Sequence, residues 1–81
     1  MRARVTVHLK PTVLDAQGAT VERALQRLGF EGVSGVRIGK HIEFALPNGD
    51  AKAARAQVEE MCRRLLVNPI IESYDIEMVK E

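Results

Sequence analysis

One segment limits the fold of this chain more than any other, the run VSGVRIGKHIEFAL at residues 33–46. Its large apolar side chains from Val36 onward all fall at even positions, a period-2 pattern that indicates β-structure with one buried face. A two-residue turn at Gly39-Lys40 would set Ile38 opposite His41 and mix apolar and polar side chains on that face. A three-residue loop over 39–41 instead pairs Ile38 with Ile42, so the run favours a hairpin of this second kind.

A single unbroken strand over 33–46 would also keep the apolar side chains on one face. At ~3.3 Å per residue it would run about 46 Å, whereas a domain of this size has a diameter of roughly 30 Å. Such a strand would project from its own domain and need a partner chain. We therefore expect the hairpin and keep one long projecting strand as the alternative.

Two amphipathic segments predict helices. In the first, Thr20 is the expected N-cap and Gly29 the left-handed residue just past the end. Its apolar face comprises Val21, Ala24, Leu25 and Leu28. The second helix follows the cap Asp50 and ends near Val67, because Asn68-Pro69 cannot continue it. Its expected buried face comprises Ala54, Val58, Met61 and Leu65, flanked by Cys62 and Leu66.

Alternating residues predict strands at both ends of the chain, around Val5 and Val7 and around Tyr74 and Ile76. The order strand, helix, strand, strand, helix, strand predicts an α+β, ferredoxin-like βαββαβ domain with two helices on one face of an antiparallel sheet. The chain of 81 residues forms one domain, 1–81. A domain this short buries only roughly 60–65% of its unfolded surface, so we also expect it to dimerise.

Charge and cysteine content exclude several classes of protein. Twelve basic and 11 acidic residues leave a net charge of +1, which argues against nucleic-acid binding. One cysteine, Cys62, cannot form an intramolecular disulfide, and on the apolar side of a helix it is expected to be a buried structural thiol. No apolar run approaches the ~20 residues of a membrane span, and the first ten residues are unlike a signal peptide. We expect a cytoplasmic protein.

No constellation of residues indicates catalysis. His8 and His41 are expected at the surface, without further ligands at metal-binding spacing. The glycines match neither a P-loop nor a dinucleotide fingerprint, and Gly39-Lys40 precedes no helix. We therefore expect no catalytic, cofactor-binding or metal-ligating residues on this chain. Two function classes stay open on these grounds, an interaction subunit and an ACT-like module that binds a small effector.

Three stretches resemble the PurS family: KPTVLDAQGATVERALQRLGF, VRIGKHIEF and CRRLLVNPIIESYDIE. One departure is Ala16, where typical members have proline. The resemblance implies a non-catalytic, homodimeric or larger small subunit of phosphoribosylformylglycinamidine (FGAM) synthase in purine biosynthesis. It would bridge a large synthetase subunit, where ATP and Mg are expected, and a glutaminase subunit, and so support ammonia transfer.

The resemblance also suggests where partner subunits make contact. The loop from Lys10 to Gly18 is expected to be an ordered surface loop that touches a partner, or else a simple crossover whose Leu14 plugs the core. A second hypothesis assigns protein–protein contact to cations near the expected hairpin. The candidate interface residues are Lys10, Pro11, Leu14, Asp15, Arg37, Lys40 and His41.

Overall fold

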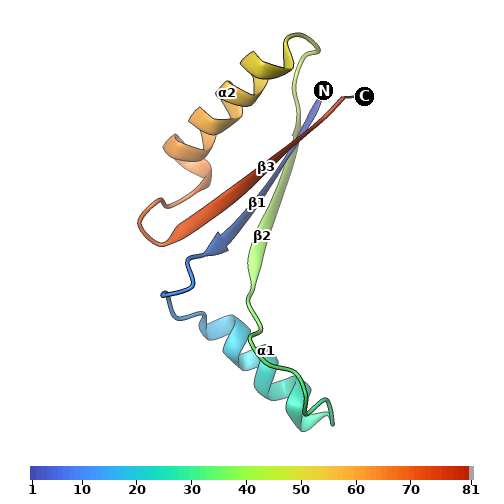
Figure 1. The fold of residues 1–81 in the computed structure, drawn as a ribbon, viewed down its shortest axis with the longest axis vertical. Coiled ribbons are helices and arrows are strands. Elements are labelled where there is room, and N and C mark those ends of the chain that lie inside the picture. Colours follow the sequence, from blue (N-terminus) through green and yellow to red (C-terminus); the bar gives the residue numbers. More distant parts are fainter. Residues whose placement is uncertain (81) are drawn as a thin grey trace.

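The computed structural model describes residues 1–80 as three antiparallel strands and two α-helices (Figure 1). In chain order the elements are β1 (Arg2–Leu9), α1 (Ala16–Arg27), β2 (Gly39–Ala45), α2 (Ala51–Met61), a π-helical turn η1 (Cys62–Leu66) and β3 (Glu72–Val79). The strand order is β2-β1-β3. The predicted α+β class, with two helices and an antiparallel sheet, is confirmed.

The core forms between one face of the sheet and α2. Strand β1 is central and turns Ala3, Val5 and Val7 inward, all fully buried. Helix α2 covers this inner face with Val58 and, at its end, Cys62, both also fully buried. Burying an aliphatic side chain of this size contributes roughly 1.5–3 kcal/mol, so this small cluster holds α2 on the sheet.

The C-terminal turn of the second helix differs from the prediction. Leu65, expected on the buried face, is 83% exposed, and Cys62 takes the buried position. The buried side chains follow an i, i+4 series through Ala54, Val58 and Cys62, and this series leaves Leu65 on the outside. The turn then closes with a π-type bond, in which Val67 N–H donates to the Cys62 carbonyl at 3.0 Å.

The predicted hairpin within 33–46 is absent. Strand β2 begins only at Gly39, and residues 33–38 pair with no strand among the described residues 1–80. A continuous long strand is not formed either, because Gly35 has a φ of +68°, a left-handed conformation outside the β region. The backbone of this segment bonds instead to side chains of α1, as described below.

Helix α1 does not cover its own sheet. It lies beyond the end of β1 and β2, so the molecule is elongated, with extents of 49 × 28 × 14 Å (Figure 1). Its Cα radius of gyration is 16.2 Å, whereas a compact domain of this length has about 12 Å. We call residues 10–38, which contain α1 and its flanking loops, the α1 arm. The expectation that both helices share one face of the sheet is therefore wrong within a single chain.

Candidate functional site

Asp15 organises the junction between the α1 arm and the sheet. It is the N-cap of α1, with Oδ1 accepting from Gly18 N–H at 2.9 Å, and its Oδ2 accepts from Ile38 N–H at 2.7 Å. The residue is only 6% exposed. These hydrogen bonds from Gly18 and Ile38, helped by the nearby charge of Arg37, lower the pKa of Asp15. An ionised carboxylate therefore joins the start of α1 to the chain that returns from its far end.

Two further side chains of α1 continue this attachment. Glu22 Oε1 accepts from Val36 N–H at 3.0 Å, and Gln26 Nε2 donates to the Val33 carbonyl at 3.1 Å. Asp15, Glu22 and Gln26 lie on one side of the helix, since their spacings of seven and four residues are close to whole turns. Three polar side chains thus form hydrogen bonds with backbone groups of residues 33–38, the segment that the period-2 pattern predicts to be a strand.

The predicted N-cap at Thr20 is wrong, and it leaves Asp15 outside the helix. Thr20, the predicted N-cap, lies inside α1 and donates its hydroxyl to the Ala16 carbonyl at 2.9 Å. The signal for the true start was present: an Asp followed three residues later by a small residue whose N–H it can bind is a common N-cap arrangement. Placing the cap at Asp15 would have added its carboxylate to the helix face that Glu22 and Gln26 share as an i, i+4 pair.

Arg37 and Lys10 hold the connecting loop. One terminal guanidinium nitrogen of Arg37 donates to the carbonyls of Lys10 and Val13, each at 3.0 Å. Lys10 Nζ donates to the Pro69 carbonyl at 2.8 Å, and Lys40 Nζ lies 3.5 Å from Glu72 Oε2. These three predicted interface cations therefore bond within the chain and brace the junction.

Pro11 and Leu14 form the exposed apolar tip of the same loop. Both residues are exposed, and Leu14 is exposed to 83%. The alternative that Leu14 plugs the core is therefore wrong, because the junction bonds of Asp15 and Arg37 hold the loop outside the sheet. An apolar side chain held in solvent by an ordered loop is suited to contact another protein.

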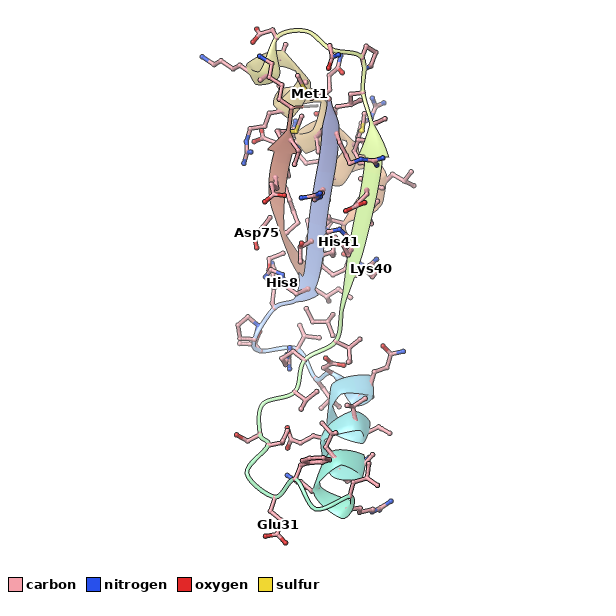
Figure 2. The ribbon with its side chains drawn as sticks, turned by 90° about the vertical axis from the view of Figure 1, so that its right-hand side faces the viewer. Met1, His8, Glu31, Lys40, His41 and Asp75 are labelled. Carbon is pink, nitrogen blue, oxygen red and sulfur yellow. The ribbon has the colours of Figure 1, made fainter. Side chains whose placement is uncertain are left out.

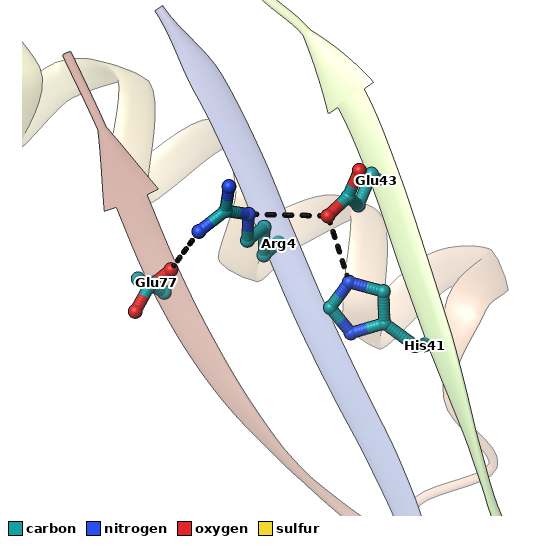
Figure 3. Close-up of polar contacts among 4 residues, drawn as sticks. All are labelled: Arg4, His41, Glu43 and Glu77. Carbon is teal, nitrogen blue, oxygen red and sulfur yellow. Dashed lines mark hydrogen bonds and ion pairs between the residues drawn. The ribbon is translucent and has the colours of Figure 1, made fainter.

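His41 lies apart from the other predicted interface residues. It is not in a turn but within β2, opposite Thr6, on the outer face of the sheet (Figure 2). Its Nε2 lies 2.9 Å from Glu43 Oε1. Arg4 contacts the same Glu43 oxygen through Nε at 3.1 Å, and its Nη1 donates to Glu77 Oε1 at 2.8 Å (Figure 3). The hydrogen bond with His41 and the charge of Arg4 lower the pKa of Glu43. A network of charged side chains thus links all three strands on the outer face.

The apolar side of α1 is exposed along the arm. Leu28 is 73% exposed, Phe30 57% and Val21 39%. Beside them a hollow of about 500 Å³ is lined by Ala16, Gln17, Thr20, Val21 and Ile38. Val21 and Leu28 were expected on the face that packs against the sheet of their own chain, and here they face solvent.

The junction presents exposed surfaces that are suited to binding. Among residues 1–80, no group of three His, Cys, Asp or Glu side chains is placed to hold a metal ion. Within the same range no helix is long and apolar enough to cross a membrane. What the junction does is position two surfaces, the apolar side of α1 and the loop tip at Leu14, at one end of the sheet.

Comparison with known proteins gives consistent matches over nearly the whole chain. A family model for PurS, described as phosphoribosylformylglycinamidine (FGAM) synthase, matches residues 2–80. A Synechocystis protein described as phosphoribosylformylglycinamidine synthase subunit PurS is 48% identical over 75 residues, which cover 93% of this chain and 75% of the relative. A protein of the same description from Methanocaldococcus jannaschii is 39% identical over 79 residues, covering 98% and 95% of the two chains.

Solved structures match equally well. One match is the crystal structure of M. jannaschii PurS, described as one of the subunits of formylglycinamide ribonucleotide amidotransferase in the purine biosynthetic pathway. It superposes with a TM-score of 0.85 at 39% identity. The match covers 94% of this chain and 92% of the other. A chain of the Thermotoga maritima PurLQS structure superposes with a TM-score of 0.86 at 30% identity, covering 94% and 93%.

Proposed function

The chain belongs to the PurS family, and from this premise we propose that it bridges the other subunits of its enzyme. As a PurS subunit it is part of phosphoribosylformylglycinamidine synthase (EC 6.3.5.3) in purine biosynthesis. The observation that carries the bridging role is its likeness to a chain of the T. maritima PurLQS structure. We also expect the chain to work in the cytoplasm.

In the proposed assembly this chain contributes surfaces and no reacting groups. The complete enzyme converts formylglycinamide ribonucleotide, glutamine and ATP to formylglycinamidine ribonucleotide, glutamate, ADP and phosphate. ATP and Mg belong to the large synthetase subunit, and ammonia comes from the glutaminase subunit. This chain holds the two together, so that ammonia passes between them.

We infer further that the chain acts as a homodimer in which the α1 arms are exchanged. Helix α2 packs on the β3 side of the sheet (Figure 1), and Ile42 and Phe44 on the inner face of β2 stay only half-buried. The apolar face of α1 is uncovered in turn. The α1 helix of a second copy would cover the inner face of β2, where the first helix of a ferredoxin-like domain lies. Exchange of an identical element between two copies is a common route to a two-fold dimer.

The seven predicted interface residues then divide by role. Pro11 and Leu14, exposed at the loop tip, are proposed to contact a partner subunit directly. Lys10, Asp15 and Arg37 support this contact by holding the loop in place. We propose that Lys40 and His41 contribute to the rim of the interface with their exposed parts, since both side chains are more than half exposed.

Light scattering after size exclusion tests the bridging role. The chain is run alone, with the synthetase subunit, with the glutaminase subunit, and with both. We expect a dimer or a larger symmetric oligomer alone, and a ternary peak that fails to form when this chain is omitted. A synthetase and a glutaminase that associate equally well without it would contradict the proposal. Binding of an amino acid to the isolated oligomer, with no binding to either subunit, would favour an ACT-like role instead.

A further inference from the structure

The edge of β2 that faces away from β1 is open. In the strand order β2-β1-β3, β1 is central and β2 pairs with it on one side only. Within residues 1–80 no strand covers the other side of β2. An unpaired strand edge presents a row of backbone N–H and C=O groups on which another strand can pair. This edge is therefore an interaction surface separate from the apolar face of α1.

The segment that leads into β2 lengthens the open edge. Val36 and Ile38 turn their N–H groups toward the α1 arm, where two carboxylates accept them. The Val36 carbonyl oxygen points the same way, since it is the atom that a Cβ at Gly18 would meet first. Backbone groups of successive residues in an extended chain point to opposite sides, so the residue between Val36 and Ile38 directs its N–H and C=O outward. The open edge thus runs from residue 36 through β2.

The apolar side chains along this edge match themselves under a two-fold axis. Two copies can pair antiparallel about an axis at Lys40. Ile38 of one copy then lies opposite Ile42 of the other on the inner face, and Val36 lies opposite Phe44. In the single chain Ile38 is exposed and the other three are half-buried. Pairing would remove this apolar surface from water, and the symmetry makes each contact twice.

The charged side chains agree with the same register. On the outer face it sets Arg37 opposite Glu43 of the second copy, and opposite charges across strands are favourable. Arg37 bonds to the connecting loop through one terminal nitrogen, and the ion pairs of Glu43 within residues 1–80 both use Oε1. A second guanidinium nitrogen and Oε2 can therefore form the new pair. Lys40 meets its own equivalent at the axis, but each lies 3.5 Å from the carboxylate of Glu72.

We infer that β2 pairs with β2 of a second copy in this register, so that the hairpin expected from the sequence forms between two chains. Self-complementarity selects a second copy over another protein, because a two-fold axis requires one surface to match itself. An axis at Ile42 would also oppose His41 and Glu43, but the α1 arms would then begin beyond the ends of the paired strands. With the axis at Lys40, residues 36–38 of each arm lie alongside β2 of the other copy, as exchange of the arms requires. This pairing rests on the proposed dimer and adds its register.

Disulfide trapping tests the register. Opposite residues that share no backbone hydrogen bond have Cα atoms about 4.5 Å apart, within the range of about 4.4–6.8 Å that a disulfide needs. In a Cys62→Ala background, I38C/I42C and V36C/F44C match the proposed register, and either pair suffices if the other does not fold. V36C/I42C and I38C/F44C are the controls, shifted by two residues in opposite directions. I42C alone reports an axis at Ile42.

Circular dichroism and light scattering under reducing conditions first establish the fold and oligomeric state of each variant. After mild oxidation we expect the two matched pairs to give at least about tenfold more covalent dimer than the shifted controls and I42C. Equal yields from the controls, or a covalent dimer from I42C alone, would overturn the register. A disulfide closed within one chain would overturn the proposal, because it marks a hairpin of the single chain.

The proposed dimer itself is tested separately in the same experiment. Matched variants that are dimeric in light scattering but form no disulfide would overturn the pairing of β2 and leave the dimer standing. A parent that is monomeric in light scattering would overturn the proposed dimer together with the pairing.

Discussion

The carboxylate of Asp15 accepts the backbone N–H of Ile38 at 2.7 Å, across 23 residues of sequence. With its second oxygen on Gly18 N–H, one side chain caps α1 and fixes the chain that leads into β2. This buried carboxylate therefore helps to set the orientation of the α1 arm relative to the sheet, together with the junction bonds of Lys10 and Arg37. Because the arm is proposed to complete a second copy, this bond influences assembly as well as folding.

Replacing Asp15 should change how stability responds to acid. Hydrogen bonds hold the pKa of Asp15 below its ordinary value, so its stabilisation is complete above the unfolded-state pKa of about 3.9 and is lost as pH falls through the lower folded-state pKa. We expect Asp15→Asn to lower the urea midpoint at neutral pH and to flatten its dependence on pH in the acid range. Circular dichroism in urea at several pH values measures both effects.

Asp50→Asn is the control for that experiment. Asp50 also caps a helix, but its side chain accepts a local hydrogen bond, from Lys52 N–H at 3.0 Å. Because asparagine caps a helix about as well as aspartate, Asp50→Asn should change the urea midpoint only slightly. An equal flattening of the acid response in both variants would show that the long-range bond to Ile38 is not responsible.

Gly18 should not tolerate a side chain although it lies within a helix. A Cβ at this position would stand 2.3 Å from the Val36 carbonyl oxygen, which belongs to the backbone. Gly→Ala in a helix ordinarily stabilises by about 1 kcal/mol. Here we expect the overlap to reverse the sign and Gly18→Ala to lower the free energy of unfolding by about 1–3 kcal/mol. Chemical denaturation gives the value, with Gly32→Ala as control, since nothing lies within 4 Å of that position.

Gly39 should be equally restrictive at the start of β2. A Cβ there would lie 2.5 Å from the Val7 carbonyl oxygen in the neighbouring strand. Gly39→Ala is therefore expected to separate the ends of β1 and β2 and to speed amide exchange of the residues that pair there, His8 and Val7. Hydrogen exchange followed by NMR resolves this. Unchanged protection at these amides would mean that the strands absorb the methyl group.

Leu28→Glu should prevent dimerisation. Leu28 is 73% exposed on the apolar side of α1, and burying a carboxylate there against a second copy costs far more than leaving it in solvent. We expect light scattering to give a monomer at concentrations where the parent is a dimer. Leu65→Glu serves as the control, because Leu65 is 83% exposed on η1, at the end of α2. The Leu65→Glu variant should remain dimeric. If Leu28→Glu and Leu65→Glu were both monomeric, the result would argue against an interface at α1.

The single thiol should react only when the chain opens. Cys62 is fully buried, and burial, with the charge of Glu59, raises the pKa of its thiol. Little thiolate is therefore present at neutral pH, and little of it is accessible. We expect an aromatic disulfide reagent to label the native protein slowly and the denatured protein at once. Rapid labelling of the native protein would mean that η1 detaches readily from the sheet.

Several elements could be read directly from the sequence. The alternation around Val5 and Val7, and again around Tyr74 and Ile76, marks β1 and β3 because a period of two specifies which side chains share a face. The cap Asp50 and the i, i+4 series through Val58 mark α2 in the same way. These elements bury their apolar faces against each other within one chain, so local pattern and final structure agree.

The segment 33–38 shows what a local pattern cannot decide. Its alternation specifies which side chains lie together, yet the N–H groups of Val36 and Ile38 can be satisfied by a strand or by carboxylates. Here Glu22 and Asp15, 14 and 23 residues away, take them. The placement of α1 outside the sheet follows from those bonds, and so do the intramolecular roles of Lys10 and Arg37. Local residue order specifies which side chains share a face. The surface that each face meets is selected by contacts between residues distant in sequence, because several arrangements satisfy the backbone equally.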